Sequence, residues 1–130
     1  MIAVYQWNLS EELRDLVNAE GWLANETTKA YADKGCSWLI DNGEYDAAAQ
    51  YDAGRYELVA LVNDTTDLEE AFMLMNVWSE PDRITKIADR VASLSIGDIL
   101  ETNGQFFVCC GEGFREIFPK YGDRTIVAAG

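Results

Sequence analysis

The chain has 130 residues, 48% of them hydrophobic and 12% aromatic, and its 23 acidic and 10 basic side chains give a net charge of −13. This length fits one domain with a substantial core, and the apolar content is too high for a disordered chain. The charge disfavours direct binding to nucleic acid or to an anionic membrane and favours a basic protein surface. We find no signal-peptide pattern and no apolar run of the ~20 residues that a membrane span needs, so we expect a cytoplasmic protein.

The first part of the chain predicts one short strand followed by helices. Residues 2–7 are apolar enough for a strand, which we place at an edge of the sheet. Capping oxygens in Asn8 and Ser10, followed by acidic residues, open a helix that Gly21 ends, and Gly35 ends a second helix. The predicted helices cover residues 10–19 and 27–34, with shorter helical turns near 36–41 and 44–50.

The second part of the chain predicts most of the sheet. Residues 55–63 form the clearest strand, and the alternation predicts one face made of Tyr56, Leu58, Ala60 and Val62. A capping-box pattern opens a helix over 67–78, and Ser-Glu-Pro before residue 82 predicts another over 81–91. The pair Asn103-Gly104 is a strong hairpin signal, since a type I′ turn needs positive φ at both positions. The further predicted strands are 97–102, 105–110 and 114–118.

These elements predict an α+β fold in which an antiparallel sheet of four to five strands packs against several helices. We expect a single domain over residues 1–130. Its parts are an acidic helical part (1–54), a sheet-forming part (55–118) and a tail (119–130).

The residue types argue against most enzymes. Without histidine the chain lacks the commonest general base and cannot form Ser-His or Cys-His pairs. A carboxylate pair could still act in catalysis, but 23 acids make chance pairs inevitable. Gly111-Glu112-Gly113 lacks the spacing of a phosphate loop and predicts a plain turn. We therefore predict no catalytic residues, no metal and no cofactor.

The three cysteines and four tryptophans predict core positions. We expect Cys36, Cys109 and Cys110 to be reduced and mostly buried. Tryptophans can anchor interfaces, but each lies in an apolar pattern, so most should be core. In the run Phe72-Met73-Leu74-Met75, either one side chain contacts a partner subunit or protein, or the helix packs on two sides.

The acidic residues are unevenly distributed. Residues 1–80 carry 16 acids and four bases, whereas residues 81–130 carry seven acids and six bases. A globule of this size is about 36 Å across, and duplex DNA of that length carries roughly 21 phosphate charges. The first segment would reach about half that density if its acids shared one face, which is enough for a nucleic-acid mimic. The candidate partner-binding residues are Glu11, Glu12, Asp15, Asp41, Glu44, Asp46, Asp64, Asp67, Glu69 and Glu70.

The chain from Tyr51 to Ile117 resembles the YodL-like domain family, small proteins of conjugative plasmids, integrative elements and phages. The matching segments are Tyr56-Glu57-Leu58-Val59, Leu68-Glu69 with Phe72 and Asn76, the block Ser93-Leu94-Ser95-Ile96-Gly97-Asp98-Ile99, and Gly113-Phe114. In the N-terminal part, Leu13-Arg14-Asp15 and Gly21-Trp22 are also similar. Cys109 and Cys110 depart from the aliphatic or aromatic residues expected there. In physical terms the Ser93–Asp98 block predicts a turn, with side chains bonded to local backbone and Gly97 allowing the bend.

The family has no established activity, so the resemblance transfers no catalytic residue. It implies the accessory gene of a mobile element in a bacterial host, and such genes often encode inhibitors of restriction or CRISPR systems. Together with the charge, this predicts a non-enzymatic inhibitor that occupies the basic DNA-binding groove of a host defence complex. The alternatives are an interaction protein that mimics no nucleic acid, a homodimer or other homo-oligomer, a charge that reflects salt adaptation, and a small enzyme with a carboxylate pair.

Overall fold

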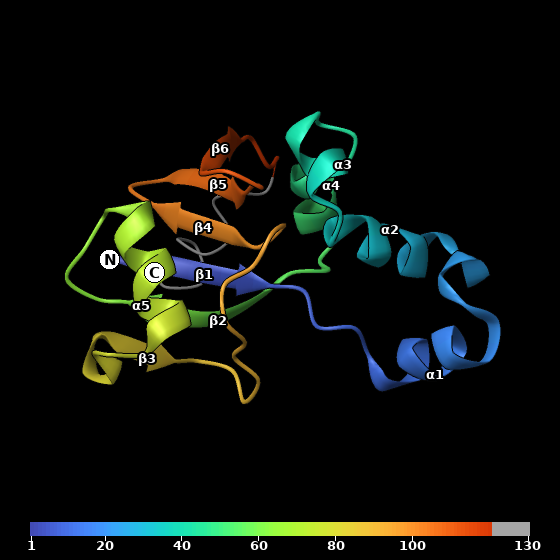
Figure 1. Ribbon diagram of the computed structural model, residues 1–130, viewed down its shortest axis with the longest axis horizontal. Helices are drawn as coiled ribbons and strands as arrows, with labels where there is room; N and C mark the ends of the chain where they lie inside the picture. The colour runs from blue at the N-terminus through green and yellow to red at the C-terminus, as the bar shows by residue number, and fades with distance from the viewer. Residues whose placement is uncertain (121–130) are drawn as a thin grey trace.

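The computed structural model describes residues 1–120 of the chain. Six strands form one sheet, and five α-helices and two 3-10 turns accompany it (Figure 1). The elements in chain order are β1 (Ile2–Gln6), α1 (Glu11–Glu20), η1 (Trp22–Ala24), α2 (Glu26–Lys34), α3 (Ser37–Asp41), α4 (Ala47–Asp52), β2 (Glu57–Val62), α5 (Leu68–Val77), η2 (Pro81–Arg83), β3 (Ile84–Lys86), β4 (Ile99–Thr102), β5 (Gln105–Cys109) and β6 (Phe114–Ile117).

The sheet is antiparallel, with the strand order β3-β2-β1-β4-β5-β6. The predicted α+β class is confirmed, with six strands where four to five were expected. The predicted edge position of the first strand is wrong, because β1 lies in the centre between β2 and β4. All five residues of β1 are buried, as a strand covered on both faces and paired on both sides must be.

A β-bulge corrects the predicted face of β2. Val4 pairs with Ala60 and Tyr5 pairs with Leu58, so one extra residue of β2, Val59, lies between these two pairs. The bulge interrupts the alternation of side chains along the strand. Tyr56 and Leu58 therefore pack on one face of the sheet, whereas Val59 and Ala60 pack on the other.

Helices cover both faces of the sheet. On one face, Leu74 and Met75 of α5 pack against Ile2 and Val4 of β1 in one hydrophobic cluster. On the other face, Ile40 of α3 joins a second cluster. This cluster contains Ala3 and Tyr5 of β1 together with Ala47 and Tyr51 of α4. The helix α1 contributes no buried residue and lies beside the sheet at the end of the molecule away from α5 (Figure 1).

The helix predicted over 81–91 is wrong. Pro81 starts only the short turn η2, after which residues 84–86 pair with β2 as the edge strand β3. Ile84 and Thr85 are β-branched, which lowers helix propensity and suits a strand. The exposed edge of β2 supplies hydrogen-bond partners that a local prediction cannot see, and the amide of Asn63 donates to the carbonyl of Arg83.

The predicted turns of the C-terminal part are confirmed. Asn103 and Gly104 have φ of 53° and 77°, and they join β4 to β5 as a two-residue hairpin. The Gly111–Gly113 turn joins β5 to β6, where the amide of Cys110 donates to the carbonyl of Gly113. Most of the predicted tail, residues 121–130, lies outside the described residues. Within residues 1–120 no helix has the length and apolarity required to cross a membrane.

Candidate functional site

The ten predicted carboxylates lie on three parts of the molecule. Glu11, Glu12 and Asp15 are exposed on α1. A second group surrounds the turn between α3 and α4, and a third surrounds the start of α5. Figure 1 places α1 and α5 at opposite ends of the long axis, so the third group is separated from the first. The second group is Asp41, Glu44 and Asp46, and the third is Asp64, Asp67, Glu69 and Glu70.

Several carboxylates of the second and third groups have structural partners. Asp46 caps α4 by accepting from the amide of Ala49, and Asp67 caps α5. Asp41 accepts from the amide of Gly111, which ties α3 to the β5–β6 turn. Glu70 forms an ion pair with Arg83 at 2.9 Å. A hydrogen bond from Thr65 and the contact with Arg83 lower the pKa of the Glu70 carboxyl. These roles explain part of the acidity by local structure alone.

The acids of the N-terminal helices are the more available group. We call residues 10–54 the acidic helical segment; it holds ten acids and three bases, a net charge of −7. All three bases are engaged: Arg14 donates to the carbonyl of Leu9, Lys29 pairs with Asp33, and Lys34 is buried. The four carboxylates of α1, which are Glu11, Glu12, Asp15 and Glu20, form no ion pair within residues 1–120. This segment therefore presents a surface of uncompensated negative charge.

Two tryptophans on the same segment are exposed, which corrects the prediction that most are core. Trp22 is 45% exposed and Trp38 is 66% exposed, whereas Trp7 is buried. Trp7 packs edge-on against Tyr31 at 5.3 Å, and Trp22 stacks on Tyr31 at 5.8 Å. This aromatic row connects the helices to β1. Met73 on α5 is also half exposed, while Leu74 is buried, so one side chain of that run faces outward.

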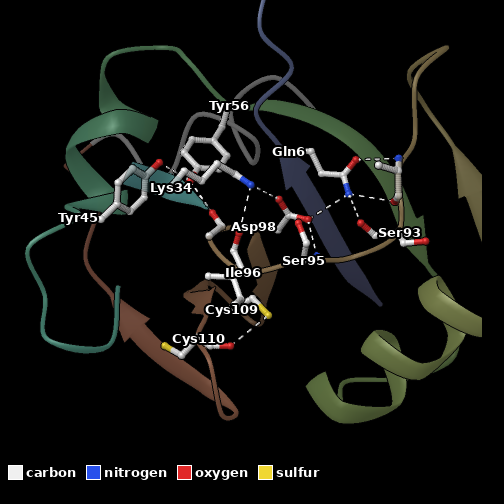
Figure 2. A network of polar contacts seen from close by, with 12 residues as sticks. Gln6, Lys34, Tyr45, Tyr56, Ser93, Ser95, Ile96, Asp98, Cys109 and Cys110 are labelled. Atoms are coloured by element: carbon white, nitrogen blue, oxygen red, sulfur yellow. Dashed lines mark hydrogen bonds and ion pairs between the residues drawn. The ribbon is translucent and has the colours of Figure 1, made fainter. Parts of the chain in front are cut away.

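A buried ion pair fixes the C-terminal end of α2 to the turn before β4 (Figure 2). The Nζ of Lys34, the last residue of α2, lies 2.9 Å from Oδ1 of Asp98. The other carboxylate oxygen accepts from the amide of Ser95 at 2.9 Å and from Nε2 of Gln6 at 3.1 Å. Burial raises the pKa of Asp98, while Lys34 and the hydrogen bonds lower it, and burial dominates.

Tyrosines extend this network. Tyr56 donates to the carbonyl of Gly97, and its hydroxyl lies 2.7 Å from that of Tyr45. Burial raises the pKa of both hydroxyls well above the usual range, so both remain protonated donors. The network therefore joins α2, β1, the residue before β2 and the turn before β4, and its contacts are of a structural kind.

The same contacts account for the Ser93–Asp98 block. The amide of Asp98 donates to the carbonyl of Ser95 while its side chain accepts from the Ser95 amide, which confirms the predicted turn. Gly97 has φ of +85°, and a Cβ there would lie 2.4 Å from Cγ of Lys34. Glycine is needed because the turn packs directly on the lysine. The hydrogen bonds that form this turn join backbone groups and the Asp98 carboxylate, whereas the sequence suggested serine hydroxyls.

A cavity of about 560 Å³ lies next to this hydrogen-bond network. It is lined by Tyr31, Lys34, Gly35, Phe72, Ser95, Ile96, Cys109, Cys110 and Gly111. Burial raises the pKa of Cys109 to about 12, and it also raises that of Cys110, so both are thiols rather than thiolates. No carboxylate is among the lining residues, and within residues 1–120 no group of three His, Cys, Asp or Glu side chains could hold a metal. All three cysteines are free, but Cys36 is exposed, contrary to expectation.

Comparison with protein-family models, with curated proteins and with solved structures finds no match for this chain. The sequence reasoning missed the Lys34–Asp98 pair, since nothing local distinguishes Lys34 from a surface lysine at a helix end. The sequence reasoning also missed the exposure of Trp22 and Trp38. The acidic residues close to both in the sequence could have indicated that these tryptophans lie at the surface.

Proposed function

We propose that this protein is a non-enzymatic inhibitor encoded by a mobile element or phage, which binds a host nucleic-acid-binding defence complex of the restriction or CRISPR kind. The acidic helical segment would dock onto the basic groove of that complex and block the path of DNA. The observation that carries the proposal is the set of exposed carboxylates on α1, which no described base neutralises. Such a surface accelerates and orients encounter with a basic partner.

The placement of the acids narrows the proposed surface. The group near α5 is distant from α1, and Arg83 partly neutralises it. Docking is therefore assigned to the acidic helical segment, which includes Glu11, Glu12 and Asp15 on α1. The exposed tryptophans on this segment favour a protein partner, because tryptophan is among the residue types enriched in interface hot spots.

The test is affinity capture of partners from a bacterial host lysate at low and at high salt, followed by DNA displacement from the captured complex. We expect a basic nucleic-acid-binding protein to be retained at low salt, released at high salt, and unable to hold labelled duplex when this protein is bound. Retention that is unchanged by salt, or retained proteins that still bind DNA fully, would contradict the proposal.

A further inference from the structure

The turn between α1 and α2 carries the most exposed apolar side chain of the acidic helical segment. We call Trp22 and Leu23 the apolar tip; Leu23 is 80% exposed and Trp22 is 45% exposed. The turn lies at the end of the molecule farthest from α5 (Figure 1). Leaving two large apolar side chains in water forgoes the free energy that burial would supply, so their placement calls for a reason.

Trp22, the first residue of the apolar tip, is held by several contacts. Oγ1 of Thr28, a fully buried side chain, donates to the carbonyl of Trp22 at 2.8 Å. Thr28 and Asn25 also form a reciprocal capping box at the start of α2. The ring of Trp22 stacks on that of Tyr31. A side chain that is already held in one conformation loses little conformational entropy on binding, so Trp22 has the property of a preorganised anchor.

The surroundings of the apolar tip define what can cover it. Glu20 and Glu26 are exposed on either side of it in the chain, so an apolar centre is flanked by negative charge. A cavity of about 260 Å³ adjoins Trp22 and is lined by Leu9, Arg14, Val17, Asn18, Trp22 and Tyr31. Anionic lipid and nucleic acid would meet repulsion at the carboxylates. A partner with apolar residues at its centre and basic residues around them fits both features.

We propose that the apolar tip and the adjoining cavity form a docking site for a basic amphipathic helix of the protein partner. An apolar side chain of that helix enters the cavity, Trp22 and Leu23 pack beside it, and its lysines or arginines face Glu20 and Glu26. This inference rests on the proposed function, since it specifies which part of the acidic helical segment a partner contacts and by what chemistry. In this docking site the burial of apolar side chains adds to the affinity that charge alone would provide.

The test uses two synthetic helical peptides of about 18 residues, or five turns. One has leucines on one face and lysines and arginines on the other, and the second replaces the leucines with glutamines. Calorimetry should show that the full-length protein binds the amphipathic peptide at least about tenfold more tightly than the polar one. Leu23→Ser should lower the affinity for the amphipathic peptide by at least about tenfold, the loss typical of an interface anchor. The affinity for the polar peptide should stay unchanged. Leu23 suits this test because its exposure makes the substitution harmless to the fold.

The matched control is Ile87→Ser, which removes a half-exposed aliphatic side chain beside β3 and should change neither affinity. Equal binding of both peptides with no effect of Leu23→Ser would overturn the docking site while leaving the proposed function standing. Absence of binding by either peptide at low salt would contradict both. Stronger binding to phosphatidylglycerol vesicles than to the amphipathic peptide would overturn the choice of a protein helix as occupant.

Discussion

The Lys34–Asp98 pair offers a quantitative test of how the acidic helical segment is attached. Both side chains are nearly inaccessible, with exposed fractions of 11% and 3%. Asp98→Asn removes the negative charge that Lys34 faces. The Nζ of Lys34 then keeps the neutral carbonyl of Ile96, 3.2 Å away, as an acceptor. Removing one partner of a buried pair typically costs about 3–5 kcal/mol, because the other charge stays buried and uncompensated.

The reverse variant, Lys34→Met, should cost less. Asp98 keeps the hydrogen bonds from Ser95 and Gln6. Because burial raises its pKa, the carboxyl can also take up a proton, which removes the uncompensated buried charge. We expect a loss of about 1–3 kcal/mol, the usual cost of a buried group with incomplete partners. The double variant removes both charges, so its loss should fall below that of Asp98→Asn alone. A double-mutant cycle then gives a coupling free energy of about 2 kcal/mol or more.

The pH dependence of Lys34→Met follows from the direction of the Asp98 pKa. Burial raises that pKa above the unfolded value, and the variant loses the strongest influence that lowers it. A carboxyl with a raised folded pKa contributes stability below its unfolded pKa and loses it as the pH rises through the folded pKa. The deficit of the variant relative to the wild type should therefore grow from about pH 4, the ordinary aspartate pKa, toward neutrality.

Urea unfolding followed by far-ultraviolet circular dichroism measures these free energies across the pH range. The reasoning is refuted if Asp98→Asn costs less than about 1 kcal/mol, or if the two single losses simply add in the double variant. It is also refuted if the Lys34→Met deficit shrinks as the pH rises.

Two further predictions concern the same region. Gly97→Ala should prevent folding or cost several kcal/mol of stability, because φ is +85° and the new Cβ would lie 2.4 Å from Cγ of Lys34. Gly104→Ala, with φ of +77° and open space around it, should cost only about 1 kcal/mol. Similar losses for both variants in thermal unfolding would contradict this account. Iodoacetamide should alkylate the exposed Cys36 in the native protein and should spare Cys109, because Cys109 is buried and burial raises its pKa to about 12. Mass spectrometry identifies the labelled cysteine, and rapid labelling of Cys109 in the native protein would contradict its buried position.

Local chemistry explains which parts of the fold were predictable from sequence. The hairpin at Asn103-Gly104 was predicted because positive φ at two adjacent positions is a property of those residues themselves. The helix α5 was predicted from the capping-box pattern Thr66-Asp67-Leu68-Glu69 and from its apolar stripe. In the structure the side chain of Asp67 caps the helix by accepting from the amides of Glu69 and Glu70.

The wrong predictions depended on contacts between distant segments. The central position of β1 is fixed by pairing with β4, some hundred residues later, and residues 84–86 are a strand only because β2 offers an open edge. For the candidate site, composition identified the acidic helical segment. The partner of Lys34 and the exposure of Trp22 needed the folded structure.

The central claim is that charge on the acidic helical segment blocks a DNA-binding groove, and the most direct measurement is the concentration of protein that displaces labelled duplex from a captured host complex. We predict that Glu11→Lys with Asp15→Lys raises this concentration at least about tenfold, within the range for charges at a docked interface. Asp82→Lys with Asp89→Lys makes the same change in net charge beside β3 and should leave the concentration nearly unchanged. Circular dichroism confirms that both variants fold. Equal displacement by the α1 variant and the wild type, or an equal loss in both variants, would contradict the account.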